Sequence, residues 1–126
     1  METPFVTIIM PIRNEEEYIE NILNDIFQQK YPQSKIEIII ADGMSSDKSV
    51  EIIEELKEKY GNLILISNYE KFIPSGLNSA LNHSIGDFII RVDGHSSIPN
   101  DYISTCIDIY RVRKNEERMV FKGVDC

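Results

Sequence analysis

Four short, nearly continuous apolar runs alternate with longer segments in which apolar residues recur at helical spacing. Such runs are typical of strands that are buried on both faces of a parallel sheet. Because crossovers between parallel strands are right-handed, the alternation predicts an α/β fold of three layers (α/β/α), with helices on both faces of a mostly parallel, Rossmann-like sheet. The expected strands are residues 5–12, 36–41, 63–67 and 87–93, and the expected helices are residues 15–30, 48–60, 74–86 and 99–115.

The first expected helix has an apolar face and an acidic first turn, which the helix dipole favours. Its apolar face consists of Tyr18, Ile19, Ile22, Leu23, Ile26 and Phe27. The second expected helix follows Asp47, a residue type that is favoured at helix N-caps. Together with Ser45 and Ser46, Asp47 is expected mainly to satisfy the free N–H groups of that helix.

The composition limits the function. The chain has 126 residues and a net charge of −8, which fits one domain and argues against binding to nucleic acid or anionic lipid. The negative net charge does not exclude a phosphate ligand, because a bound divalent metal reverses the local charge. The two cysteines, Cys106 and Cys126, do not make a disulfide framework or a metal-binding cluster. We expect no signal peptide and no membrane span in this chain, and a cytoplasmic location, with the inner face of the membrane as an alternative.

Polar residues follow two of the expected strands directly. Ligands of open α/β sheets bind outside the carboxyl ends of the strands. Asp42 ends the second strand, where its carboxylate can accept a hydrogen bond from a ribose hydroxyl or a base N–H. Asp42 precedes the residues that cap the next helix, so a ligand is the favoured partner for it.

Asp93 ends the fourth strand and His95 follows two residues later. In an extended backbone these two side chains point to the same side and can share a divalent cation. Mn²⁺ accepts this mixed oxygen and nitrogen set more readily than Mg²⁺ does. A single Asp-x-His sequence is weak evidence for a metal site, because it more often marks a strand end followed by a histidine in a turn. Its expected position opposite Asp42 in the sheet strengthens the metal-site hypothesis. Arg91 points either to a helix layer or to the site.

The first expected strand ends in "PIRNEEE", without a glycine. It therefore lacks the G-x-G-x-x-G fingerprint of dinucleotide-binding domains, and the chain has no Walker A loop. Asn14 and Glu15 either cap the first helix or face a ligand.

Three segments in this order resemble the family-two inverting glycosyltransferases, which have the glycosyltransferase A-type fold and use nucleotide-diphosphate sugars. They are "VTIIMPIRNEEEYI", "ADGMSSDKS" and "GLNSALNHSIGDFIIRVDGH", and the resemblance covers nearly the whole chain from Val6 onward. The D-x-H version within "RVDGHSSIPNDYI" looks most like a subgroup concerned with succinoglycan-type exopolysaccharide synthesis.

The resemblance implies roles for single residues. The nucleotide, with UDP as the first candidate, would be held by Pro11, Arg13, Asn14, Glu15, Asp42 and Asp93. Asp93 and His95 would bind the divalent metal, with Mn²⁺ favoured over Mg²⁺, and the metal would neutralise the diphosphate leaving group. A hydroxyl of a saccharide or a lipid-linked acceptor would then attack the anomeric carbon with inversion.

Family members carry their catalytic base and acceptor-binding region after the part that is matched here. The resemblance therefore implies that residues 1–126 are the N-terminal, nucleotide-sugar-binding part of a truncated glycosyltransferase domain. The base is expected beyond Cys126, the acceptor-binding part is expected to be absent, and the fragment alone is expected to be inactive. Membrane-anchoring segments are common at the far end of relatives.

Three other hypotheses stay open. The first is a module that binds a nucleotide sugar without turnover, which the missing base favours for this chain alone. The second is a nucleotidyltransferase, although that class usually has a glycine-rich phosphate loop after the first strand. The third is a purely structural role, which leaves the polar strand ends unexplained.

Overall fold

The computed structural model describes residues 3–70, 73–113 and 120–121, and its centre is one sheet with the strand order β3-β2-β1-β4-β5. The strands are β1 (Val6–Ile12), β2 (Ile36–Asp42), β3 (Leu63–Ser67), β4 (Phe88–Arg91) and β5 (Val120–Phe121). Every neighbouring pair is parallel. The predicted α/β class and parallel sheet are confirmed, and β5 is an addition because two residues carry too little pattern for prediction.

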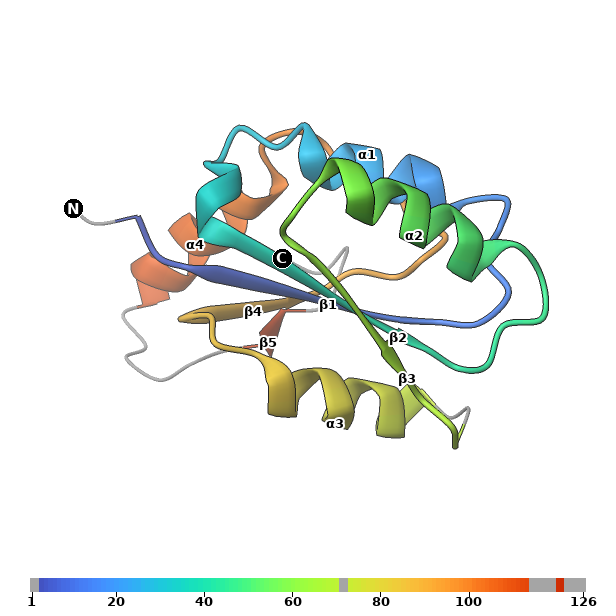
Figure 1. Cartoon of the computed structure of the whole chain (residues 1–126). Helices are drawn as coiled ribbons and strands as arrows, with labels where there is room; N and C mark the ends of the chain where they lie inside the picture. The colour runs from blue at the N-terminus through green and yellow to red at the C-terminus, as the bar shows by residue number, and fades with distance from the viewer. Residues whose placement is uncertain (1–2, 71–72, 114–119, 122–126) are drawn as a thin grey trace.

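Helices cover both faces of this sheet (Figure 1). They are α1 (Ile19–Phe27), α2 (Ser49–Lys59), α3 (Ile73–His83) and α4 (Tyr102–Arg113), with a 3₁₀ turn at Gln33–Lys35. The first, second and fourth helices lie on one face, and α3 lies on the other. This is the predicted three-layer arrangement. None of the helices in the described part of the chain is long and apolar enough to cross a membrane.

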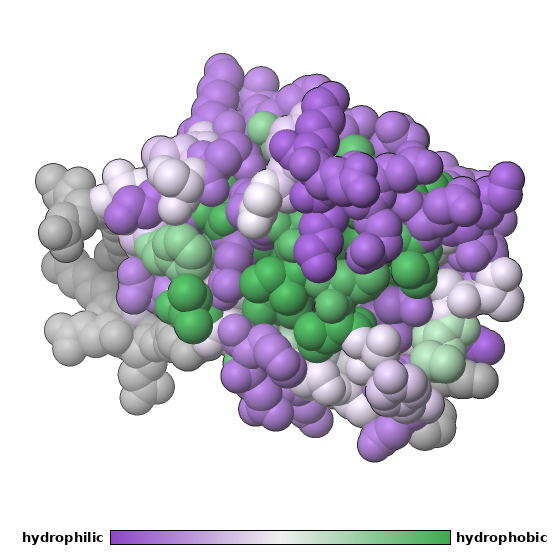
Figure 2. Space-filling view, viewed as in Figure 1, coloured by the Kyte–Doolittle hydropathy of each residue, from purple (hydrophilic) through white to green (hydrophobic). Residues whose placement is uncertain are grey.

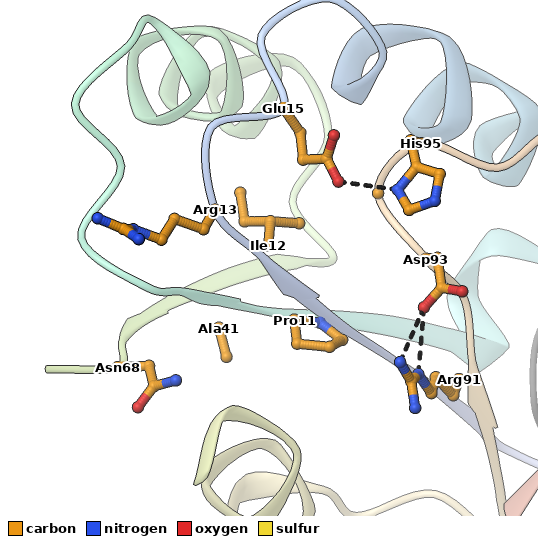
Figure 3. Close-up of a pocket in the computed structure, with 10 residues that line it drawn as sticks. Pro11, Ile12, Arg13, Glu15, Ala41, Asn68, Arg91, Asp93 and His95 are labelled. Atoms are coloured by element: carbon orange, nitrogen blue, oxygen red, sulfur yellow. Dashed lines mark hydrogen bonds and ion pairs between the residues drawn. The ribbon is translucent and has the colours of Figure 1, made fainter. Parts of the chain in front are cut away.

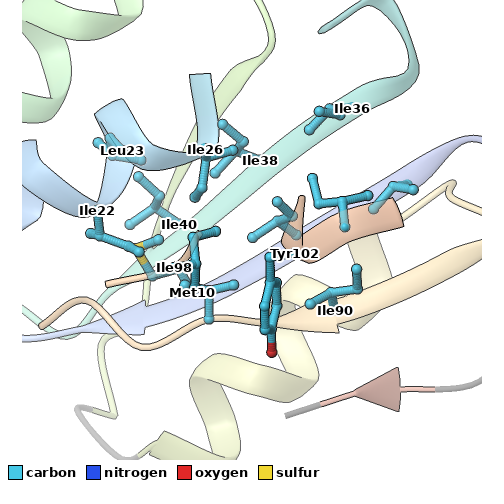
Figure 4. Close-up of a cluster of buried hydrophobic side chains, with 14 of the residues drawn as sticks. Met10, Ile22, Leu23, Ile26, Ile36, Ile38, Ile40, Ile90, Ile98 and Tyr102 are labelled. Atoms are coloured by element: carbon cyan, nitrogen blue, oxygen red, sulfur yellow. The ribbon is translucent and has the colours of Figure 1, made fainter. Parts of the chain in front are cut away.

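The two faces of the sheet form two separate hydrophobic clusters. Alternate residues of a strand point to opposite faces, so Ile8 and Met10 of β1 face the larger cluster while Ile9 faces the smaller one beneath α3. Figure 4 shows the larger cluster between α1 and the sheet. Every residue of β2 is buried. Burial on both faces explains why the central strands are nearly continuous apolar runs.

One expectation about the core is wrong. Tyr18 was placed on the apolar face of the first helix, but its side chain is 48% exposed, because α1 begins only at Ile19. The preceding residues form a turn, in which the N–H of Tyr18 donates to the carbonyl of Glu15 at 3.0 Å. Cys106, which was expected in a helix, is buried in the larger cluster.

A buried carboxylate ties the segment before β4 to the central strands. The hydroxyl of Thr7 donates to Oε2 of Glu37 at 2.6 Å, and the N–H of Ile85 donates to the same oxygen at 2.8 Å. The N–H of Gly86 donates to the Thr7 hydroxyl at 2.8 Å. Glu37 is 7% exposed and Thr7 is fully buried, so these bonds satisfy groups that water does not reach.

Gly86→Ala is expected to lower the free energy of unfolding by about 1–3 kcal/mol, the range for overpacking a well-packed site. The added Cβ would lie 2.5 Å from the Thr7 hydroxyl oxygen and 2.6 Å from the Thr7 nitrogen. Urea unfolding would measure the loss. Gly61→Ala is the matched control, because nothing lies within 4 Å of its added Cβ. Equal stability of the two variants would contradict the close approach at Gly86.

Candidate functional site

A cavity of about 220 Å³ lies at the carboxyl ends of the strands. Figure 3 shows residues that line it, which come from the ends of β1, β2, β3 and β4. The lining consists of Pro11, Ile12, Arg13, Glu15, Ala41, Asn68, Arg91, Asp93, Gly94 and His95. The cavity is therefore where an open α/β sheet binds its ligands.

Two acid–base pairs stand in this cavity. Nε and Nη2 of Arg91 both lie 3.1 Å from Oδ1 of Asp93. Nδ1 of His95 lies 2.9 Å from Oε2 of Glu15. The hydrogen bond and the negative charge of Glu15 raise the pKa of His95 above its ordinary value, and Asp93 adds a smaller effect. Arg13 extends away from the Glu15–His95 pair in Figure 3.

The residues fit a divalent cation in part. Oδ2 of Asp93 and Nε2 of His95 make no hydrogen bond with the residues that the structure describes. Each of these two side chains therefore keeps one atom that is free to coordinate a cation. A carboxylate oxygen with an imidazole nitrogen suits Mn²⁺. No group of three such side chains stands together in residues 3–70 and 73–113, so phosphate oxygens of a ligand would have to complete the coordination.

The turns after β1 and β2 are joined by hydrogen bonds. Oδ1 of Asn14 accepts from the N–H groups of Ser46 at 2.7 Å and of Asp47 at 3.3 Å. In return, the N–H of Asn14 donates to the hydroxyl of Ser45 at 2.9 Å, and the N–H of Glu15 donates to that of Ser49 at 2.8 Å. We call this set the turn–turn contact. Asn14 therefore binds the neighbouring turn and does not cap its own helix.

Asp42 is 7% exposed and does not line the cavity. Its carboxylate accepts hydrogen bonds from the N–H of Ser45, at 3.2 Å, and from the Ser45 hydroxyl. The sequence analysis favoured a ligand as the hydrogen-bond partner of Asp42, and in the structure Asp42 is bonded to a residue of its own turn. A role for Asp42 toward a nucleotide stays a prediction, and so does a ligand contact for Asn14.

The structure brings five of the predicted site residues together in the cavity. They are Pro11, Arg13, Glu15, Asp93 and His95. It also adds residues that the sequence analysis left open or missed. Arg91 turns to the site, and Asn68, which is 6% exposed, follows β3 directly. A polar residue directly after a strand was the signal used for Asp42 and Asp93, and the same signal marks Asn68.

Sequence comparison decides the family. Residues 7–115 match the model of Glycosyl transferase family 2. The chain belongs to this family. It is 34% identical over 122 residues to a dolichyl N-acetyl-alpha-D-glucosaminyl phosphate 3-beta-D-2,3-diacetamido-2,3-dideoxy-beta-D-glucuronosyltransferase of Methanococcus voltae. That match covers 94% of this chain and 38% of the relative, so this family 2 chain spans little more than a third of its relative's length.

Solved structures share the fold. A mannosyltransferase from Pyrobaculum calidifontis, in complex with GDP-Man and Mn²⁺, has a TM-score of 0.82 and 28% identity over 87% of this chain and 33% of its own. TarS 1-349 from S. aureus, in complex with UDP-GlcNAc, has a TM-score of 0.75 and 25% identity over 86% of this chain and 32% of its own. The family 2 chain therefore has the α/β fold of these glycosyltransferases.

Glu15→Gln is expected to lower the pKa of His95 toward its ordinary value of 6.5, because Glu15 is the main cause of the shift. The raised pKa means that the pair contributes stability in full below pH 6.5 and that this contribution is lost as pH rises through the pKa of the folded state. NMR titration of the imidazole would follow the change. Asp93→Asn should lower the same pKa by less, and a larger effect from Asp93→Asn would refute this assignment.

Met44→Gly is expected to raise the free energy of unfolding by about 0.5–1 kcal/mol, because a left-handed backbone costs most residues more than glycine. Met44 has a φ of 62° and is one of the exposed large apolar residues, at 43%. Asn14, with a φ of 55°, is the contrasting position. Asn14→Gly should lower stability, since it removes the acceptor of the turn–turn contact. Urea unfolding of both variants distinguishes backbone strain from side-chain bonding.

Proposed function

We propose that this chain is the nucleotide-sugar-binding part of a glycosyltransferase that moves a sugar from a nucleotide-diphosphate donor to a saccharide or lipid-linked acceptor in cell-surface glycan synthesis. The observation that carries the proposal is the gathering of Glu15, Arg91, Asp93 and His95 in one cavity at the strand ends. The family match over residues 7–115 supports the assignment of this cavity to sugar transfer.

The proposed roles follow from the free atoms and charges of the cavity. Oδ2 of Asp93 and Nε2 of His95 face a divalent cation, with Mn²⁺ favoured over Mg²⁺. When bound, that cation supplies charge neutralisation to the diphosphate leaving group. Pro11 and Ala41 offer an apolar wall for the base, and Asn68 brings a polar side chain to the same cavity. Asp42 is proposed to contact the ribose, which requires its bonds to Ser45 to open. Arg13 adds a positive charge at the rim, which attracts an anionic donor.

The nucleotide itself is proposed from related structures. The neighbours described above hold UDP-GlcNAc or GDP-Man, and one of them also holds Mn²⁺. We propose a UDP-sugar as the donor, inversion at the anomeric carbon, and a place in exopolysaccharide synthesis at the cytoplasmic side of the membrane. The D-G-H sequence at residues 93–95 supports the exopolysaccharide assignment.

A second candidate is a module that binds the donor without turnover. Both carboxylates that line the cavity, those of Glu15 and Asp93, are already paired with a basic side chain. Within the described residues, the cavity lining offers no unpaired carboxylate to accept the proton of an attacking hydroxyl. The 126-residue chain is thus expected to bind the donor and to leave it intact.

Asp93→Asn is expected to weaken Mn²⁺-dependent binding of UDP by at least about tenfold. The amide keeps the size of the side chain and removes the charge that attracts the cation. Calorimetric titration of UDP, with and without Mn²⁺, would measure the effect, and Asp42→Asn should weaken binding by less. Asp108→Asn is the matched control, because Asp108 is an exposed residue of α4 outside the cavity. No binding of UDP or GDP to folded wild-type chain would refute a donor site in this chain.

A further inference from the structure

A second hollow, of about 370 Å³, lies beside α1 and shares His95 with the cavity described above. We call it the α1 groove. Its lining consists of Tyr18, Asn21, Asn24, Asp25, Gln28, His95, Ser96 and Ser97. One wall is a face of α1 with the residue that precedes it, and the other wall is the segment that follows β4.

The helix wall carries an aromatic ring and a row of amides. Asn21, Asp25 and Gln28 follow one another at intervals of four and three residues along one side of α1, and Tyr18 lines the groove just before the helix begins. The side chains of Tyr18, Asn21, Asn24 and Gln28 make no hydrogen bond with other residues in the described part of the chain. Each amide offers two N–H donors and one carbonyl acceptor, so donors and acceptors face the groove together.

The far wall is held in place by α1 itself. Oδ2 of Asp25 accepts from the hydroxyl of Ser97 and from the N–H of Ile98, both at 3.1 Å. The side-chain amide of Gln29 donates to the carbonyl of Pro99 at 2.6 Å, and its oxygen accepts from the N–H of Ile103 at 3.0 Å. The two walls are therefore fixed relative to each other before a ligand arrives, which lowers the entropic cost of binding.

The charges of the groove exclude several ligands. No lysine or arginine lines it, and its one basic side chain, His95, is already paired with Glu15 through Nδ1. The groove therefore lacks the cluster of cationic donors that binds a phosphate or an acidic sugar. Its one carboxylate, Asp25, is already used by the far wall. An apolar peptide would leave the amides without partners, which is costly. The remaining class is a neutral ligand with many hydroxyls and a flat apolar face, since such a face packs on an exposed aromatic ring.

We propose that the α1 groove is a saccharide-binding subsite that holds a neutral segment of the acceptor or product glycan. The ring of Tyr18 packs against the apolar face of one sugar unit. The amides of Asn21, Asn24 and Gln28 bind the hydroxyls of the same and the next unit. The assignment of this saccharide to the acceptor or product rests on the proposed function, whereas binding of a neutral saccharide follows from the groove alone.

The test is NMR titration of the 126-residue chain with the neutral trisaccharides chitotriose, cellotriose and maltotriose. The side-chain NH₂ signals of Asn21, Asn24 and Gln28 report on the groove directly. We expect at least one trisaccharide to shift these signals at millimolar concentration. Tyr18→Ala should weaken that binding by about tenfold, and Tyr18→Phe should keep most of it because the ring remains. Tyr69→Ala is the matched control, since Tyr69 is 76% exposed and lies outside the groove.

The proposal is overturned if none of the trisaccharides shifts the three amide signals, or if Tyr18→Ala and Tyr69→Ala bind equally well. It is also overturned if UDP, and no trisaccharide, shifts these signals. UDP with Mn²⁺ is titrated separately and should shift the backbone signal of Gly94 in the first cavity. Binding of a trisaccharide without binding of UDP would support the saccharide subsite and refute the proposed donor site. The failure of one proposal can therefore be told apart from the failure of the other.

Discussion

The burial of β1 and β2 on both faces is the constraint on which the rest of this molecule depends. Every residue of the two strands is buried except Pro11, which is partly exposed. A strand with no polar face needs cover on both sides, and in this parallel sheet the crossover helices supply it. Polar chemistry is then confined to the strand ends. The carboxyl ends of parallel strands meet at one edge, where the first cavity is found.

The register of β1 and β2 places their two turns side by side. Ile12 is paired with Asp42, so Asn14 and Met44 stand at equivalent positions, two residues beyond the ends of their strands. Both have a left-handed backbone, and no glycine among the described residues does. This geometry directs the N–H groups of each turn toward the other. The turn–turn contact thus uses the side chains of Asn14, Ser45 and Ser49 to accept hydrogen bonds from backbone N–H groups that precede the first turns of α1 and α2.

The sequence predicted the fold well, because burial on both faces leaves an unmistakable pattern in β1, β2 and β4. It predicted the first cavity in part. Strand ends can be located from the sequence, so Asp93 and His95 were found, but side-chain direction depends on neighbours that are distant in the sequence. Asp42 was expected to face a ligand. Its carboxylate accepts hydrogen bonds from Ser45, and its contact with a nucleotide stays a prediction. Tyr18 fits the helical period, yet the hydrogen bonds of the adjoining turn delay the start of α1 until Ile19.

The two acid–base pairs of the first cavity bear directly on the proposed metal site. An unpaired carboxylate at a partly buried position loses hydration, and Glu15 and Asp93 each have a basic partner, His95 and Arg91. Pairing usually blocks a metal site, because the cation must compete with the existing partner. Here both bonds of Arg91 go to Oδ1 of Asp93, and Glu15 takes Nδ1 of His95. Oδ2 and Nε2 stay available, so the two pairs are compatible with the proposed cation site.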